Sequence, residues 1–201
     1  MDNLLKHIEN LQSFGLPVIV SINVFANDTP DEWQVIRETC ARMRVPVALS
    51  EHFYRGGAGA EDLARLVIQT AAQPRKDPLN FTYPDDLPLL EKARLIAQKI
   101  YGADDVVAEG RTAAKLRSFE EAGFGQLPIC MAKTQYSLSA TPGLRGRPQG
   151  FTLPLRDARL SAGPGFVVVS SGDIMTMPGL PKVPAAEAMD VDANGNTVGL
   201  F

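Results

Sequence analysis

Apolar positions define the first half of the chain as an alternation of helices and strands. The runs LPVIVSIN (16–23) and VPVALS (45–50) are continuous, rich in β-branched residues, and predict buried parallel strands. Ahead of them, apolar residues recur at helical spacing up to Gly15 and predict an amphipathic helix, with Leu4, Leu5, Ile8, Leu11 and Phe14 on one face.

A helix is predicted after each of these two strands. The first begins with a capping box, in which Thr29 and Glu32 satisfy free amides and Pro30 takes the first helical position. The second is expected from about Gly59 to Ala72. Strands and helices that alternate with short connections are typical of an α/β protein with a parallel sheet.

The second half of the chain has longer connections between its predicted elements. Residues 74–88 hold four prolines and are expected to be irregular, and 133–150 form a long loop rich in Gly, Pro and Arg. Helices are predicted over 88–102 and about 109–122. Strands are predicted over 127–132, 151–161 and 165–177, and a hairpin turn is predicted at Asn194 and Gly195. We therefore expect an α/β fold over residues 1–201 as a single domain: a mostly parallel sheet flanked by helices, with a C-terminal β-hairpin.

Composition and charge exclude several classes of function. With 201 residues and 45% hydrophobic content the chain can bury a core, and its net charge of −3 is spread without a basic block, which argues against nucleic-acid binding. No apolar stretch reaches the roughly 18 residues of a membrane span, and no leader pattern precedes the first helix. Cys40 and Cys130 are far apart, so neither a disulfide framework nor a metal pair is predicted. We expect a cytoplasmic protein without a membrane partner.

Three known motifs are incomplete in this sequence. A phosphate loop needs G-x-x-x-x-G-K, but the Gly-Lys dipeptide never occurs, and Gly57-Ala58-Gly59 is a dinucleotide-binding fingerprint without its third glycine. The tail from Asp190 to Gly195 matches the first half of a calcium loop, but the twelfth position is Phe201 instead of glutamate. His52 has only Glu51 nearby as a further ligand. We predict no metal site.

Aromatic residues follow both early strands at their carboxyl ends. Asn23 and Phe25 follow the first strand, and Phe53 follows the second. Because the carboxyl ends of parallel strands meet at one edge, where α/β proteins bind ligands, both rings are predicted to face one crevice and to stack on a flat heteroaromatic ligand. The alternative is that both rings close the end of the core. Gly56, Gly57 and Gly59 would let the backbone approach a ligand or cap the next helix.

The loop 133–150 is a second candidate region. It carries donors suited to a carboxylate or a phosphate, and the alternative is solvated loop charge. The set comprises Lys133, Thr134, Gln135, Tyr136, Arg145 and Arg147.

Several strings in the sequence resemble formate–tetrahydrofolate ligase, also called formyltetrahydrofolate synthetase. They include FGLPVIVSINVFANDT, VALSEHFYRGGAGAEDLA, GFGQLPICMAKTQYSLS and GDIMTMPGLPKVPAAEAMDVD, and they cover nearly the whole chain in order. The resemblance implies a ligase of one-carbon metabolism, which makes formyl phosphate from formate and ATP with magnesium and transfers the formyl group to N10 of tetrahydrofolate. The chain resembles the C-terminal third of such an enzyme, its folate-side domain, without the N-terminal nucleotide-binding domain.

The resemblance also implies roles for single residues. In the family a Phe and a Trp sandwich the pterin, and Phe25 and Phe53 occupy these positions, where Glu51-His52-Phe53 departs from the common Glu-Val-Trp. Other residues implied at the folate site or its cleft are Asn23, Leu49, Glu51, Gly56, Gly57, Lys133, Thr134, Gln135, Tyr136 and Arg145.

The ligands and partners implied are those of the intact ligase. Tetrahydrofolate is the substrate expected here, whereas ATP and magnesium belong to the intact enzyme and are not expected to bind this chain tightly. Partners would be the missing N-terminal domains or a separate subunit, with a homo-oligomer also possible. The chain alone is expected to be inactive. The alternative is a non-catalytic folate-binding or assembly module.

Overall fold

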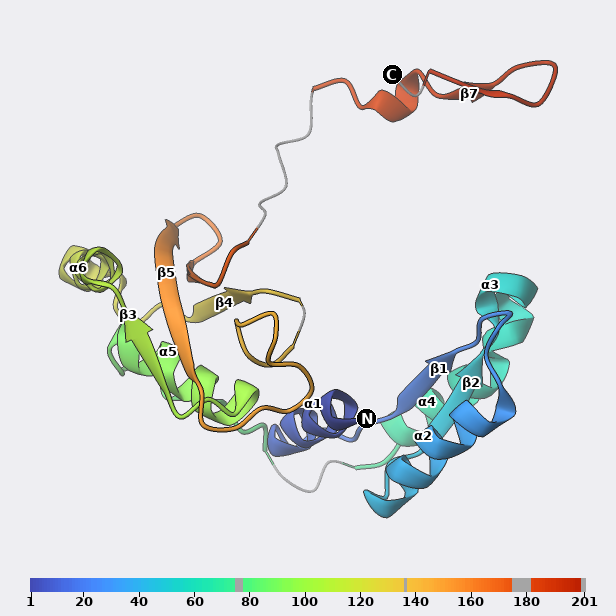
Figure 1. Ribbon diagram of the computed structural model, residues 1–201, viewed down its shortest axis with the longest axis horizontal. Coiled ribbons are helices and arrows are strands. Elements are labelled where there is room, and N and C mark those ends of the chain that lie inside the picture. The colour runs from blue at the N-terminus through green and yellow to red at the C-terminus, as the bar shows by residue number, and fades with distance from the viewer. Residues whose placement is uncertain (75–77, 136, 175–181, 200–201) are drawn as a thin grey trace.

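Two short parallel strands form the first sheet, which is flanked by helices. The computed structural model describes residues 1–74, 78–135, 137–174 and 182–199 (Figure 1). Strands β1 (Val20–Asn23) and β2 (Val47–Ser50) pair in parallel, and the elements around them are α1 (Asp2–Ser13), α2 (Pro30–Arg42), α3 (His52–Arg55), the 3-10 helix η1 (Gly56–Ala60) and α4 (Glu61–Ala71). Their core contains Ile8, Val20, Cys40 and Val45.

The capping box predicted for α2 is confirmed. The Glu32 amide donates to Thr29 Oγ1 at 3.4 Å, and the Thr29 amide donates to Glu32 Oε2 at 2.8 Å. Both amides precede the helical ladder and would otherwise have no partner. The local sequence therefore fixes the start of this helix and the length of the turn that follows β1.

The second sheet has four strands in the order β3-β5-β6-β4. These are β3 (Asp105–Ala108), β4 (Ile129–Lys133), β5 (Thr152–Ser161) and β6 (Phe166–Ser171). β3 and β5 are parallel, as are β4 and β6, whereas the neighbours β5 and β6 are antiparallel. With β1 and β2, most strand pairs are parallel, which confirms the predicted α/β class.

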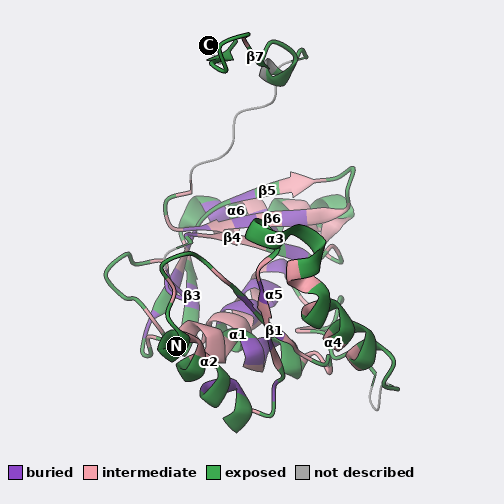
Figure 2. Cartoon of the chain, turned by 90° about the vertical axis from the view of Figure 1, so that its right-hand side faces the viewer, coloured by how far each residue is buried: buried purple, intermediate pink, exposed green. Residues whose placement is uncertain are grey.

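Helices α5 and α6 pack against the four-stranded sheet. α5 (Leu89–Ile96) continues into a π-helical turn η2 (Ala97–Tyr101), and α6 (Gly110–Phe119) continues into η3 (Glu120–Phe124). Buried positions alternate along β6 (Figure 2). Val167 and Val169 therefore enter the core, which also contains Leu89, Ala93, Leu116, Leu153 and Leu155. Gly102 stops the α5–η2 helix in the left-handed region at φ +75°, as its position in the sequence predicted.

Helix α1 connects the two sheet units. Its Ile8 packs in the core of the first unit, while Lys6 Nζ and Asn10 Nδ2 each donate at 2.8 Å to the carbonyls of Lys99 and Ile100 in the second. The two terminal guanidinium nitrogens of Arg147 also donate to the two carboxylate oxygens of Glu9, each at 2.7 Å. Figure 1 accordingly places α1 between β1–β2 and the four-stranded sheet. Whether residues 1–201 form a single domain stays a prediction.

A third, two-stranded sheet forms the predicted C-terminal hairpin. β7 (Asp190–Val191) and β8 (Thr197–Val198) are antiparallel, and Gly195 in the turn has φ +84°. Asp192 Oδ1 accepts from the amides of Asn194 and Asn196 at 2.9 and 2.8 Å, and the Asn196 amide and side chain contribute most to lowering the pKa of Asp192. Asp192, one of the residues that resembled half of a calcium loop, thus organises this turn.

Three features of the fold were not predicted from the sequence. The strands before the C-terminal hairpin form two separate sheets instead of one. Strand β3 was missed, and the stretch after β2 forms α3 and η1 before the expected helix begins. The predicted end of the third strand in this half, residues 175–177, lies outside the described residues. Cys40 is buried, Cys130 is exposed, and both are free. Among the helices within the described ranges, none has the length and apolar character required to cross a bilayer.

Lys92 is fully buried beneath the turn that follows η3. Its Nζ donates to the carbonyls of Gly125 and Leu127 at 2.9 and 3.0 Å and lies 5.9 Å from the centre of the Tyr83 ring. Burial lowers the pKa of Lys92, and the carboxylates of Asp85, Asp86 and Glu120 oppose that shift. The lysine thus satisfies two carbonyls at the end of the helix that leads into β4.

We expect Lys92→Met to lower the free energy of unfolding by about 2 kcal/mol, because two partly buried carbonyls lose their donor. Lys99→Met is the control, since Lys99 is exposed and the Thr82 carbonyl that it contacts can bind water instead. Urea unfolding followed by far-ultraviolet circular dichroism measures both. Equal stability losses in the two variants would contradict a special role for Lys92.

Candidate functional site

The carboxyl ends of β1 and β2 lie side by side, as the sequence predicted. Asn23 is in register with Ser50, and the amide of Val24 extends the ladder by donating to the Ser50 carbonyl at 3.0 Å. In open α/β sheets ligands bind in the crevice outside such strand ends. The segments from residue 23 and from residue 50 onward therefore share one edge of the sheet.

Tyr54 links the segments that follow the two strands. Its hydroxyl accepts from the amide of Ala26 at 3.1 Å, and its ring meets that of Phe53 edge-on, with centroids 4.9 Å apart. In the turn after β1, the Phe25 amide donates to Asp28 Oδ2 at 2.8 Å. These contacts hold the turn that carries Phe25 and tie it to the segment of Phe53 and Tyr54. No local pattern in the sequence indicates this role of Tyr54, because its partner lies 28 residues away.

The rings of Phe25 and Phe53 are exposed. Phe25 retains 58% of its accessible surface and Phe53 retains 76%, so neither ring closes the end of the core. Figure 2 shows α3, which carries Phe53, as an exposed helix. Exposed apolar side chains mark an interaction site when they form one contiguous patch. The exposure argues against the alternative in which both rings close the end of the core.

Glu51 and Gly59 close the connection between β2 and α4. The Glu51 amide donates to the Gly59 carbonyl at 2.8 Å, and a Cβ placed on Gly59 would lie 2.6 Å from the carbonyl carbon and oxygen of Glu51. The Glu51 carboxylate pairs with Arg55 at 2.8 Å. Gly56 has φ +55°, and a Cβ on Gly57 would meet nothing within 4 Å. Gly59 is thus required by packing, whereas Gly57 is free at the surface.

Polar groups accompany the rings at this edge. Ser50 is buried, and its Oγ lies 2.9 Å from Nδ1 of the exposed His52. Asn23, beside Ser50 in the register, is exposed. Leu49 is half-buried and pairs with Ile22 inside the sheet.

The other predicted region, the loop that begins at Lys133, follows strand β4 of the four-stranded sheet. Lys133 ends β4 and directs Nζ to the carbonyls of Thr134 and Ser139, each at 2.7 Å, and to that of Ser137. The ammonium also lies 5.5 Å from the centre of the Tyr101 ring, and burial lowers the pKa of Lys133. An ammonium has three N–H donors, and three loop carbonyls accept them here. Lys133 therefore orders its own loop.

The remaining loop residues differ in exposure. Thr134 is buried, Gln135 and Arg145 are exposed, and Tyr136 lies outside the described residues. Arg147 is paired with Glu9. A hollow of about 370 Å³ is lined by His7, Tyr101, Lys133, Gln135 and their neighbours. The structure thus groups this loop with α1 and η2, on a different sheet from Phe25 and Phe53.

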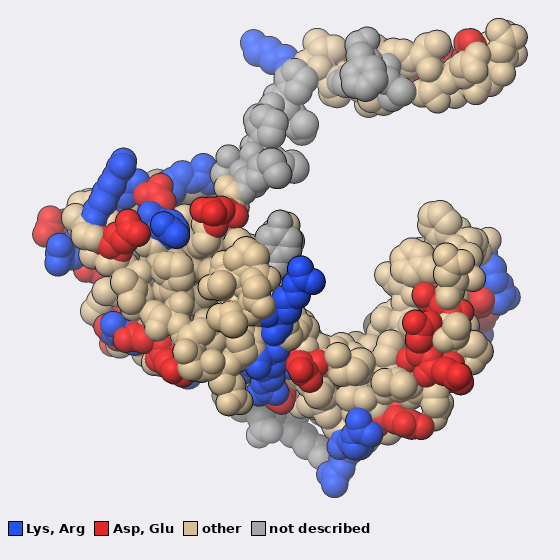
Figure 3. Space-filling view, in the orientation of Figure 1, with Lys and Arg blue, Asp and Glu red and all other residues tan. Residues whose placement is uncertain are grey.

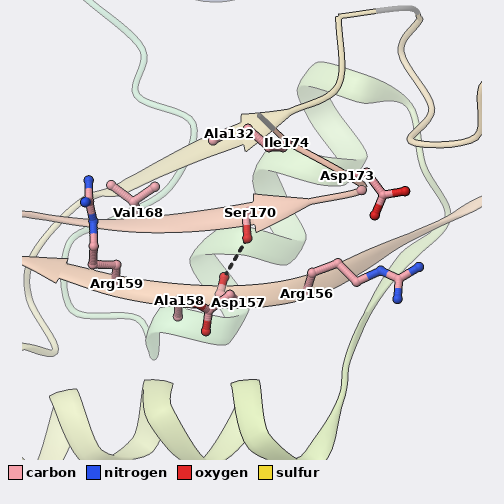
Figure 4. Close-up of a pocket in the computed structure, with 10 residues that line it drawn as sticks. Ala132, Arg156, Asp157, Ala158, Arg159, Val168, Ser170, Asp173 and Ile174 are labelled. Carbon is pink, nitrogen blue, oxygen red and sulfur yellow. Dashed lines mark hydrogen bonds between the residues drawn. The ribbon is translucent and has the colours of Figure 1, made fainter. Parts of the chain in front are cut away.

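A further hollow of about 610 Å³ lies on the four-stranded sheet and was not anticipated from the sequence. Its lining includes Ala132, Arg156, Arg159, Val168 and Asp173 (Figure 4). Across it, Ser170 Oγ donates to the Asp157 carbonyl at 3.4 Å. In the described part of the chain, no three His, Cys, Asp or Glu residues gather in a way that could hold a metal ion.

Comparison with known proteins covers the whole chain. The sequence profile of the family described as formate–tetrahydrofolate ligase matches residues 1–201. The chain belongs to the formate–tetrahydrofolate ligase family. This confirms the resemblance seen in the sequence.

Individual relatives agree with this assignment. The formate–tetrahydrofolate ligase of Methylobacterium sp. (strain 4-46) is 52% identical over 200 residues, which are 99% of this chain and 36% of the relative. That of Granulibacter bethesdensis is 50% identical over 201 residues, 99% of this chain and 35% of the relative. The ligase of Roseobacter denitrificans is 50% identical over 201 residues, which are 99% of this chain and 36% of the relative. The chain therefore spans about a third of the length of the curated formate–tetrahydrofolate ligases that it matches.

The space-filling view shows how this part of a formate–tetrahydrofolate ligase is shaped. A broad hollow separates the unit built on β1–β2 from the unit built on the four-stranded sheet (Figure 3). Uncharged surface predominates at the end of the β1–β2 unit, where α3 lies (Figures 1 and 3).

Proposed function

We propose that this chain is the folate-binding C-terminal third of a formate–tetrahydrofolate ligase, which joins formate to tetrahydrofolate with ATP to give 10-formyltetrahydrofolate. In this proposal the pterin stacks against Phe25 and Phe53. The observation that carries it is the exposure of both rings beyond the paired ends of β1 and β2, in a chain of this family. A stacked aromatic pair contributes about 0.5–1.5 kcal/mol beyond area burial.

The other residues implied by the family resemblance have supporting roles. Asn23 and Glu51 supply polar groups next to the rings, and Leu49 supplies apolar surface at the strand end. Gly56 and Gly57 allow the pterin to approach the backbone, which fits the open space around both positions. Across the broad hollow between the two units, the loop ordered by Lys133 would contribute Gln135 and Arg145 to contacts with the polar part of the folate.

The phosphoryl chemistry is assigned to the rest of the ligase. Formyl phosphate formation requires ATP, magnesium and formate held in line, and the Gly-Lys of a phosphate loop is missing from the sequence. The working enzyme would join this chain to a nucleotide-binding part, within one polypeptide or as a separate subunit in the cytoplasm. Exposed apolar side chains on α4, Val67 and Ile68, support such a contact.

Removal of either ring should weaken tetrahydrofolate binding without unfolding the protein. We expect Phe25→Ala and Phe53→Ala each to raise the dissociation constant at least about tenfold, which corresponds to about 1.4 kcal/mol. Both rings are exposed, so the midpoint of thermal unfolding should remain unchanged. Isothermal titration calorimetry of the chain with tetrahydrofolate measures the affinity.

Phe81→Ala is the matched control, because Phe81 is 82% exposed and lies in the connection after α4. Its affinity should equal that of the wild type. Equal weakening in all three variants would mean that the two strand-end rings form no specific platform. A well-folded wild-type chain that does not bind tetrahydrofolate would favour the alternative of an assembly module.

A further inference from the structure

His52 and Ser50 form a polar pair next to the proposed pterin platform. Ser50 is the last residue of β2 and is only 3% exposed, whereas His52 begins α3 and is exposed, immediately before Phe53. Ser50 Oγ and His52 Nδ1 are 2.9 Å apart. This contact restrains the imidazole at the edge of the sheet where Phe25 and Phe53 stand.

The burial of Ser50 determines which way this hydrogen bond runs. A buried hydroxyl needs an acceptor for its proton, and within the described residues His52 Nδ1 is the partner recorded for Ser50 Oγ. The serine hydroxyl therefore donates and Nδ1 accepts. In a neutral imidazole one nitrogen accepts and the other carries the proton. This places the proton on Nε2, which has no hydrogen-bond partner among the described residues.

We propose that His52 Nε2–H donates a hydrogen bond to an acceptor on the edge of the flat ligand stacked at Phe25 and Phe53, and that Ser50 sets the tautomer that makes this possible. The inference rests on the proposed folate function. For a tetrahydropterin the matching acceptor is the 4-oxo group. His52 is then a specificity-determining residue, which selects a carbonyl over an amino group at that edge, and Ser50 is a positioning residue that acts through it.

The test compares two ligands across four proteins. The ligands are tetrahydrofolate and its 4-amino-4-deoxy analogue, in which an amino donor replaces the carbonyl acceptor. The proteins are the wild type, His52→Val, His52→Gln and Ser50→Ala. Glutamine can place an amide donor near the position of Nε2, whereas valine provides none.

In the wild type, tetrahydrofolate should bind about tenfold more tightly than the amino analogue. His52→Val should weaken tetrahydrofolate binding about fivefold, the effect of one neutral hydrogen bond, and reduce the preference for the carbonyl ligand by a similar factor. His52→Gln should retain most of the preference. Ser50→Ala should lower it, and the ¹⁵N shifts of His52 should show a larger share of the Nδ1–H tautomer than in the wild type.

The outcomes separate this inference from the function on which it rests. If the wild type binds tetrahydrofolate but His52→Val leaves the ligand preference unchanged, or weakens both ligands equally, the role of His52 is overturned and the folate function stands. If the folded wild type binds neither ligand, the proposed function fails and the inference fails with it. A loss of preference that glutamine restores supports both.

Discussion

Gly59→Ala should lower the free energy of unfolding of the β1–β2 unit by about 3 kcal/mol. The added methyl group would lie 2.6 Å from the carbonyl carbon and oxygen of Glu51, which are backbone atoms that cannot rotate away. Overpacking of this kind costs about 1–3 kcal/mol, and separation of the two segments also breaks the hydrogen bond from the Glu51 amide to Gly59. Urea unfolding followed by the fluorescence of Trp33, the one tryptophan in the sequence, reports on this unit.

Gly57→Ala is the matched control in the same turn. A methyl group there meets no atom within 4 Å, and the backbone of Gly57 is not in the left-handed region. Its stability should equal that of the wild type or exceed it slightly, because alanine restricts the unfolded chain. Equal stability of the two variants would show that the contact between Gly59 and Glu51 is looser than described.

The second large effect concerns ligase turnover, which should be absent from this chain alone. A mixture of the chain with ATP, magnesium, formate and tetrahydrofolate should give no 10-formyltetrahydrofolate above the rate without protein. Phosphoryl transfer depends on groups that hold the γ-phosphate and the metal ion. The sequence lacks the Gly-Lys of a phosphate loop, and the ammonium of Lys133 already donates to loop carbonyls.

The full-length ligase of Methylobacterium sp. (strain 4-46) provides the positive control for this assay. A second arm adds the remaining two-thirds of that ligase as a separate polypeptide, which should restore turnover if the two parts assemble. Formation of 10-formyltetrahydrofolate by the chain alone would contradict the proposal that the phosphoryl chemistry belongs to the rest of the ligase. Phe25→Ala in the restored mixture should raise KM for tetrahydrofolate more than it lowers kcat.

Local sequence signals predicted the helices and the turns well. The capping box at Thr29 and the stop at Gly102 each depend on residues within one helical turn, so the sequence contains the whole signal. Strand β3 has no comparable signal, because two aspartates precede its two valines. Its strand geometry comes from pairing with β5, which is distant in the sequence. Pairing partners also explain why the strands divide between two sheets: β4 lies beside β6 and not beside β2.

The candidate site shows the same limit. The parallel pairing of β1 and β2 could be predicted, and with it the proximity of the segments that carry Phe25 and Phe53. The link from Tyr54 to Ala26 could not, since no local pattern indicates a hydrogen bond to a distant amide. Lys133 looked like a free cation in the sequence, and only the fold shows three carbonyls around its ammonium. Sequence patterns located the region, and tertiary contacts determined which groups remain available.

The exposure of Phe25 and Phe53 has a consequence for how this part of the ligase can diverge. Both rings stand beyond the last ladder residues, Asn23 and Ser50, and contribute little to the buried core of the unit. If they form the folate site that we propose, substitutions at these two positions will alter ligand preference while the free energy of folding stays nearly constant. The phenylalanine at position 53, where the family resemblance implies a tryptophan, would therefore bear on ligand affinity and not on folding.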